Sequence, residues 1–195
     1  EKYGVSVVGI TVSKEQAALA RERCKDWPVE IRVCDYRDVN PSTTLGAGEK
    51  FDNIISLGMF EHVGYKNYRK YFEVAERCLK DGGFFFLHTI GNNYSMTIGD
   101  PWAVKYIFPG GMLPSVAQMG KATEGLFVME DWHNFGTDYD KTLMQWFKNF
   151  DSAWLAPSGV EGPSLKEKYG DRFYRMWKYY LLSFAGSFRA RHIQL

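Results

Sequence analysis

The chain has 195 residues, 45% hydrophobic and 24% charged, and its 24 basic and 23 acidic residues give a net charge of +1. This composition is typical of one globular domain with a sizeable core, and it excludes a global positive field for nucleic acid. Cys24, Cys34 and Cys78 show no metal-ligand spacing and no even framework, so we expect a reducing compartment and no metal site. No apolar run is long enough to span a bilayer and no signal-peptide pattern opens the chain, so we expect a soluble, cytoplasmic protein.

The first 50 residues predict two strands separated by a helix. The run 5–10 indicates a buried strand, and Ser13 with Gln16 forms a capping-box pattern that opens a helix to about Lys25. Alternation over 29–33 predicts the second strand. Residues 40–50 carry proline and glycines and predict an exposed loop.

The most informative stretch is 51–64. Its apolar first half predicts a strand buried in a parallel sheet, which breaks at Gly58 into a polar cluster. Glu61 therefore follows the carboxyl end of a central strand, the edge at which open α/β sheets bind ligands. In the alternative interpretation, Glu61 and His62 only begin the next helix, where an acid suits the positive end of the helix dipole.

A helix and a third long strand follow this stretch. Residues 65–79 predict the helix, with Asp81-Gly82-Gly83 as its stop, and residues 84–91 predict the strand. A strand, helix and strand of these lengths make a βαβ unit, so His88 and Glu61 are expected near the same sheet edge. A histidine in that position can also be purely structural.

The second half is rich in aromatic residues, which favours core packing but could also wall a pocket for an apolar or cationic ligand. We expect its amphipathic helices to pack on the sheet, with membrane-surface binding as the alternative. The predicted elements are a long structured connection over 92–115, a helix over 115–122, a strand over 126–131, helices over 138–154 and 171–187, and the start of a strand within 189–195.

No G-x-G-x-x-G or phosphate loop occurs, although the alternating pattern suits a nucleotide or cofactor binder. Several segments nevertheless resemble the cyclopropane-fatty-acyl-phospholipid synthase family, in one order and at fitting spacing. They include GMFEHVG at 58–64 and EDWHNFGTDY at 130–139, and the others are 8–16, 35–38, 87–91, 106–111, 113–115 and 188–191.

The resemblance implies an α/β class I S-adenosylmethionine-dependent methyltransferase fold. It implies a single catalytic domain over 1–195 that lacks the family's first strand, glycine-rich turn and first helix, and that stops within the last strand. The implied reaction adds a methylene group to the cis double bond of a phospholipid acyl chain through a carbocation, with bound bicarbonate as the base. The residue at the position of a family cysteine is Phe184, which rules out a nucleophile there.

The resemblance also assigns site residues. Bicarbonate is expected to contact the side chains of Glu61, His88 and Tyr139 and the backbone N–H of Ile90. The aromatic residues Trp102, Tyr106 and Phe108 are expected to line an acyl tunnel. The residues expected along S-adenosylmethionine are Thr11, Val12, Ser13, Lys14, Glu15 and Gln16 at its ribose and methionine part, and Asp35 and Tyr36 at its adenine.

The implied partners are an unsaturated phospholipid and the inner face of the membrane, contacted peripherally, with no nucleic acid and with a homodimer allowed. Two other functions stay open. One is an acyl-chain methyltransferase or methylenetransferase that closes no ring. The other is a non-catalytic lipid-binding scaffold, against which the acid, imidazole and phenol at one sheet edge argue.

Overall fold

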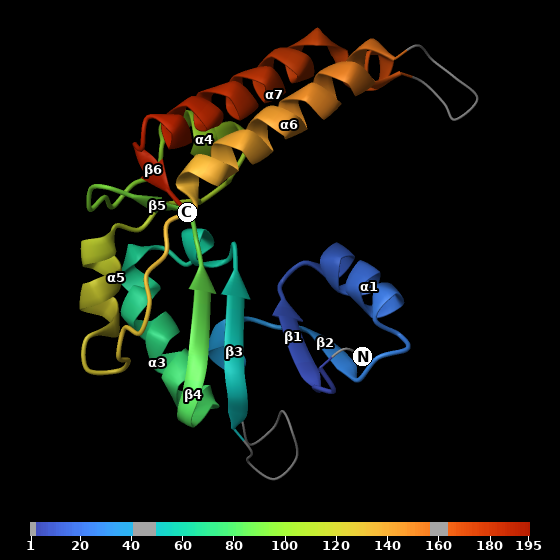
Figure 1. Ribbon diagram of the computed structural model, residues 1–195. Helices are drawn as coiled ribbons and strands as arrows, with labels where there is room; N and C mark the ends of the chain where they lie inside the picture. The colour runs from blue at the N-terminus through green and yellow to red at the C-terminus, as the bar shows by residue number, and fades with distance from the viewer. Residues whose placement is uncertain (1–2, 41–49, 157–163) are drawn as a thin grey trace. The chain divides into compact units, whose positions relative to one another are not determined.

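The computed structural model describes residues 3–40, 50–156 and 164–195 (Figure 1). The chain forms two compact units, each described here by itself. The first comprises 1–56, 67–87 and 123–127, and the second comprises 57–66, 88–122 and 128–195. The single catalytic domain expected from the sequence stays a prediction, and the predicted loop over 40–50 falls almost entirely outside the described residues.

The first unit begins with β1 (Val7–Thr11), α1 (Lys14–Arg23) and β2 (Val29–Val33). The two strands pair in parallel with Val7 opposite Val29, as a strand–helix–strand unit requires. Ser13 caps α1 as predicted, because its Oγ accepts the Gln16 N–H at 3.1 Å. The reciprocal half of the capping box is wrong, since the Gln16 side chain instead accepts a hydrogen bond from the Thr11 hydroxyl at 2.9 Å.

The unit continues with β3 (Phe51–Leu57), α3 (Tyr68–Cys78) and β4 (Leu79–His88), and a short 3₁₀ turn, Tyr36–Asp38, follows β2. Strands β3 and β4 are neighbours in one sheet and their arrows point the same way in Figure 1, which confirms the predicted βαβ unit. The predicted helix stop is wrong: α3 ends at Cys78, and the segment Asp81-Gly82-Gly83 already belongs to β4.

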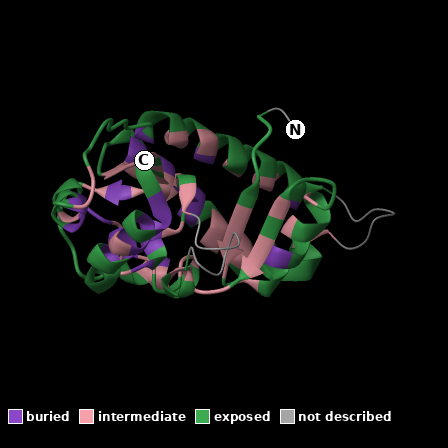
Figure 2. Ribbon diagram, turned by 90° about the horizontal axis from the view of Figure 1, so that it is seen from below, coloured by how far each residue is buried: buried purple, intermediate pink, exposed green. Residues whose placement is uncertain are grey.

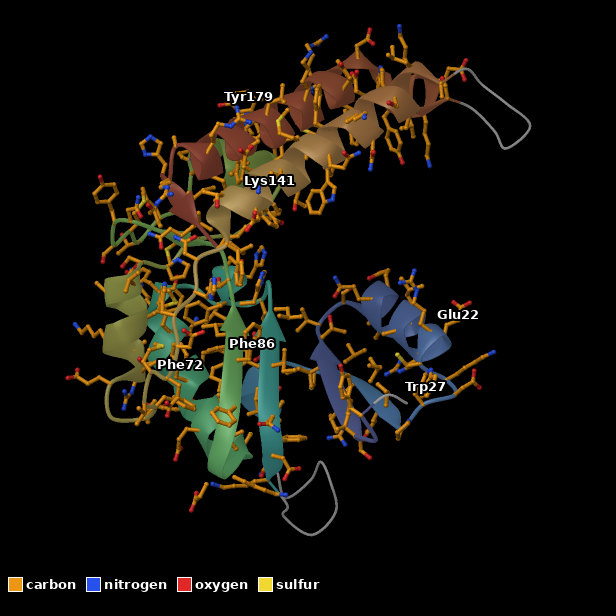
Figure 3. All side chains as sticks on the ribbon, viewed as in Figure 1. Glu22, Trp27, Phe72, Phe86, Lys141 and Tyr179 are labelled. Atoms are coloured by element: carbon orange, nitrogen blue, oxygen red, sulfur yellow. The ribbon has the colours of Figure 1, made fainter. Side chains whose placement is uncertain are left out.

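Helix α3 covers one face of this strand pair. Phe72 on α3 meets Phe85 of β4 at 5.9 Å between ring centroids, and the Tyr71 hydroxyl donates to Ser56 Oγ of β3 at 2.5 Å. Side chains alternate across a strand, so Phe86 lies on the opposite face from Phe85 (Figure 3).

The strands are less buried than the sequence predicts. Neither β1 nor β2 contains a buried residue, and both are pink or green in Figure 2. In β3 only Ser56 is buried, whereas Ile55 is 69% exposed. The apolar residues of β3 predicted that other elements pack on both faces of the sheet. Within the described residues, however, only the face of β3 and β4 that α3 contacts is covered.

The second unit is mostly helical. Its elements are the 3₁₀ turn Phe60–His62, β5 (Gly91–Asn92), α4 (Pro101–Tyr106), α5 (Val116–Thr123), α6 (Gly136–Leu155), α7 (Leu165–Arg189) and β6 (Ile193–Gln194). Strands β5 and β6 pair antiparallel, with Gly91 opposite Gln194. A further 3₁₀ turn, Tyr65–Asn67, precedes α3.

Three predictions for this half have different outcomes. The helix over 115–122 is confirmed as α5. The strand over 126–131 is wrong, because the segment is irregular; Phe127 packs on Phe72 while Val128 is 81% exposed. The connection over 92–115 contains a helix that the sequence reasoning missed, α4, which Asp100 caps by accepting the Ala103 N–H at 2.8 Å.

Helices α6 and α7 pack against each other and form the core of the second unit. The buried core residues are Leu143, Tyr180, Leu181, Ala185 and Phe188. Both helices were predicted, although α7 begins earlier than expected, at Leu165, and has a kink at Gly170, whose φ is 72°. The apolar faces predicted to pack on the sheet meet each other instead.

Candidate active site

Glu61 is placed by the turn that ends β3. Gly58 has a φ of +61°, a conformation that suits glycine, and its N–H donates to the His88 carbonyl at 3.0 Å. The chain then forms the turn Phe60–His62, anchored by the fully buried Phe60. This turn is itself a short 3₁₀ helix with Glu61 in its first turn, and α3 begins only at Tyr68, so the alternative that Glu61 merely begins a helical segment stays open.

The carboxylate of Glu61 is buried and half satisfied. Its Oε1 accepts the backbone N–H of Ile90, the second residue after β4, at 2.8 Å, and this hydrogen bond fixes the orientation of the acid. Its carbonyl oxygen accepts the Met112 N–H at 2.8 Å. The second carboxylate oxygen, Oε2, is buried and has no hydrogen-bond partner among the described residues.

His88 presents a second buried atom of this kind. It is the last residue of β4, and its Nδ1 is buried without a partner in the described part of the chain. An unsatisfied buried polar atom costs about 1–3 kcal/mol. Two such atoms, on an acid and on an imidazole at the ends of neighbouring parallel strands, indicate a place for a ligand with both a donor and acceptors.

Tyr139 lies in the first turns of α6, half-buried between Phe188, at 4.9 Å between ring centroids, and Trp146, at 5.9 Å. Burial raises the pKa of the Tyr139 hydroxyl, and the charge of Glu61 raises that pKa further. The hydroxyl therefore stays protonated at neutral pH as a donor, and the interaction indicates that the phenol lies near the Glu61 carboxylate.

Aromatic side chains pack around Phe108 in the same unit as Glu61 and Tyr139. Phe108 lies 6.5 Å from His62 and 5.5 Å from Tyr180 between ring centroids, and 6.2 Å from Phe184. Tyr180 of α7, to which no site role was assigned from the sequence, is 7% exposed. Burial, and then the neighbouring Tyr139, raise the pKa of Tyr180 to about 12. No spacing pattern distinguishes Tyr180 from the other aromatic residues next to it in the sequence.

The predicted cofactor segment lies in the first unit, at the carboxyl ends of the parallel strands β1 and β2. The Thr11 hydroxyl accepts the Ser13 N–H at 3.2 Å, and the Ser13 hydroxyl donates to Glu15 Oε2 at 3.0 Å. Val12, between them, is 75% exposed. Lys14 and Gln16 are also exposed, so the segment presents several polar groups at an edge suited to ligands.

Asp35 and Tyr36 follow β2. Both carboxylate oxygens of Asp35 pair with the Arg37 guanidinium, at 2.9 and 2.7 Å, and these hydrogen bonds lower the pKa of Asp35 to about 2. The Tyr36 ring packs edge-on against Tyr71 at 5.3 Å, and its buried hydroxyl has no partner within the described residues. Burial raises the pKa of that hydroxyl.

In the described ranges, no group of three or more His, Cys, Asp or Glu side chains could hold a metal ion. The geometry instead brings together Glu61 and Ile90 by a hydrogen bond, and Tyr139 with Glu61 by electrostatic interaction.

Comparisons with known proteins identify the family of the chain. A family described as mycolic acid cyclopropane synthetase matches residues 1–195. The chain is 52% identical over 193 residues to the cyclopropane-fatty-acyl-phospholipid synthase of Escherichia coli (strain K12), covering 99% of this chain and 46% of that protein. It is 33% identical to the sphingolipid C9-methyltransferase of Komagataella phaffii over 196 residues, covering 93% of this chain and 38% of that one.

A similar solved structure is that of the mycolic acid cyclopropane synthase CmaA1 complexed with SAH and CTAB. Its TM-score is 0.82 at 26% identity, and the match covers 99% of this chain and 68% of that one. The fold is therefore the class I S-adenosylmethionine-dependent methyltransferase fold. The chain spans about half the length of the curated relatives it matches, 46% of the Escherichia coli protein.

Proposed function

Because the chain belongs to the mycolic acid cyclopropane synthetase family, we propose that it is the catalytic part of an S-adenosylmethionine-dependent cyclopropane-fatty-acyl-phospholipid synthase. The enzyme would convert the cis double bond of an unsaturated phospholipid acyl chain to a cyclopropane ring. The observation that carries the proposal is a pair of buried atoms, Glu61 Oε2 and His88 Nδ1, that have no hydrogen-bond partner among the residues the structure describes.

The residues of the first unit fit a cofactor with an adenosyl group and an amino-acid tail. The charged Asp35 carboxylate can accept a hydrogen bond from the adenine, and the Tyr36 hydroxyl, which has no partner within the described residues, can donate one to it. The hydroxyls of Thr11 and Ser13 can form hydrogen bonds with the ribose and methionine part. Lys14, Glu15 and Gln16 complete this segment, and Val12 offers apolar contact. When bound, S-adenosylmethionine supplies the methyl group and bicarbonate supplies the base that removes a proton at ring closure.

Glu61, His88 and Tyr139 fit bicarbonate by the chemistry of their atoms. Glu61 Oε2 can accept the hydroxyl of the ion, which avoids repulsion between two negative groups. His88 and the protonated Tyr139 hydroxyl can donate to its other oxygens, as preorganised donors do for an oxyanion. The Ile90 N–H, predicted as a further donor to the ion, donates to Glu61 Oε1 in the structure and thereby holds the acid in place.

The aromatic residues near this set suit the acyl chain. A carbocation on that chain reacts with any nucleophile within reach, so its surroundings must be inert. Phe108 and Phe184 offer only ring faces, which also attract a positive charge. The resemblance also assigns Trp102 and Tyr106 to this lining, and their ring centroids lie 5.6 Å apart, although the Tyr106 side chain is exposed.

A phospholipid substrate implies peripheral contact of the protein with the inner face of the cytoplasmic membrane. No nucleic acid is part of this function, and a homodimer stays a prediction.

Product analysis tests the proposal. The full-length protein that contains this chain is incubated with dioleoyl phospholipid and S-adenosylmethionine, and the released acyl chains are analysed by gas chromatography and mass spectrometry. We expect a saturated chain with a cyclopropane ring. A methyl-branched or methylene-branched chain would assign the protein to non-cyclising methyltransferases. Lipid binding with no transfer of the methyl group would support the non-catalytic scaffold.

A further inference from the structure

An exposed surface of the second unit combines arginine, lysine and tyrosine side chains. It is formed by Lys105 and Tyr106 of α4 and by Arg172, Arg175 and Tyr179 of α7, all exposed, and is called here the α4–α7 surface. Tyr179 projects from α7 in Figure 3. Within the described ranges, no helix is long and apolar enough to cross a bilayer.

Ring contacts make the surface continuous across the two helices. Trp102 of α4 packs edge-on against Tyr179 at 4.5 Å between ring centroids and lies 5.6 Å from Tyr106. The Lys105 ammonium lies 5.2 Å from the centroid of the Tyr106 ring. Beyond the kink at Gly170, Arg172, Arg175 and Tyr179 are spaced by three and four residues and therefore share one helix face.

The surface carries a local positive charge that the net charge of +1 conceals. Helix α7 has six basic and two acidic residues. Neither Arg172 nor Arg175 lies within 4.0 Å of an acidic side chain in the described part of the protein. The acid nearest in sequence, Asp171, is 3.9 Å from Lys166, and Arg189 is paired with Asp140. Two arginines on this face are thus available for an external anion.

We propose that the α4–α7 surface docks the protein on an anionic phospholipid bilayer. Tyrosine side chains are favoured at the level of the lipid headgroups, because the apolar ring can contact the acyl chains while the hydroxyl stays in water. Arginine and lysine attract anionic lipid headgroups. This inference rests on the proposed function, which makes a membrane phospholipid the substrate. Phe108 follows α4 by two residues and Tyr180 is next to Tyr179 on α7, and their ring centroids lie 5.5 Å apart among the aromatic residues of the candidate active site.

Vesicle co-sedimentation of the full-length protein tests the proposal. The probes are vesicles of phosphatidylglycerol mixed with phosphatidylcholine and vesicles of phosphatidylcholine alone. The double variant Arg172→Gln/Arg175→Gln should bind the anionic vesicles about 30-fold more weakly than the wild type, because each cation near such a surface contributes about five-fold. Tyr179→Ser should also weaken binding, with less dependence on salt.

The matched control removes two exposed lysines from α6, in Lys141→Gln/Lys148→Gln; Lys141 is labelled in Figure 3. It should change vesicle binding by less than about two-fold. The proposal is overturned if the arginine variant binds as the wild type does, if the lysine control loses as much affinity, or if phosphatidylcholine alone is bound equally well.

Activity on detergent-dispersed phospholipid separates the two proposals. The arginine variant should keep wild-type turnover there, since no bilayer is needed, and lose activity on anionic vesicles. If the wild type binds vesicles through this surface but transfers no methyl group in either assay, the proposed function fails and the docking surface stands. If turnover occurs but the arginine variant binds normally, the docking surface alone fails.

Discussion

Tyr180 shows how a buried phenol beside the candidate active site affects stability. Its pKa rises from an ordinary value of 10 to about 12 because burial disfavours the phenolate and Tyr139 lies nearby. The folded state therefore holds this proton more tightly than the unfolded state does. The resulting stabilisation is complete below pH 10 and is lost as the pH rises through about 12.

Replacing Tyr180 by Phe should reduce this alkaline loss of stability. Two pKa units correspond to at most about 2–3 kcal/mol, so the wild type should lose up to about that much more free energy of unfolding than the variant between pH 10 and about 12. Urea unfolding of both proteins over a pH series measures this difference in the free energy of unfolding. The exposed Tyr94 supplies the control Tyr94→Phe, and equal pH dependence of the wild type and Tyr180→Phe would refute the explanation.

Part of the candidate active site could be predicted from residue types and spacing. Glu61 and His88 lie at the ends of neighbouring strands of a βαβ unit, and that topology alone puts them at one edge of the sheet. Tyr139 could not be found in this way, because it lies in a helix far along the chain and no local pattern marks it; only the family resemblance indicated it. The hydrogen bond from Ile90 to Glu61 depends on tertiary geometry that no spacing reveals.

At the level of elements, the close approach of β3 and β4 depends on Gly83. A Cβ on this residue would lie 2.9 Å from Leu79 Cδ1 and closer still to the carbonyl oxygen of Asp52. Gly83→Ala should therefore destabilise the protein by about 2 kcal/mol or more, since backbone must move. Gly120 of α5 is the control: a Cβ there meets nothing within 4 Å, and Gly120→Ala should stabilise the helix by up to about 1 kcal/mol.

Thermal unfolding of the two variants decides this point. A melting temperature that falls for Gly83→Ala and rises or stays constant for Gly120→Ala is expected. Equal effects of the two substitutions would mean that the spacing between β3 and β4 tolerates a methyl group.

The elements themselves were predicted with uneven success, for physical reasons. Helices α1, α3, α6 and α7 have either a capping residue or a clear apolar stripe, and each was found. The strand expected over 126–131 has a suitable composition but pairs with no strand in the described part of the chain. Pairing is a tertiary property that composition does not determine. Helix α4 was not predicted, because it is only six residues long and the glycines and prolines around it are typical of loops.

For the molecule as a whole, the class I methyltransferase fold followed from the family resemblance and is confirmed by the solved structures. The alternating strands and helices indicated an α/β class but could not distinguish this fold from other cofactor binders. The apolar faces of β3 and β4 also show why burial was overestimated: Phe84 and Phe86 are 66% and 56% exposed, although their type predicts cover.

The central claim is that Glu61, together with His88 and Tyr139, acts in the chemical step. Single-turnover rates and S-adenosylmethionine affinity of the full-length protein test it most directly. Glu73→Gln, which changes a partly exposed acid of α3 that pairs with Arg69, is the control for Glu61→Gln. We predict that Glu61→Gln and His88→Ala lower the rate by about 10²–10³-fold while cofactor affinity changes little, and that Glu73→Gln changes neither. Wild-type rates in Glu61→Gln and His88→Ala would contradict the claim.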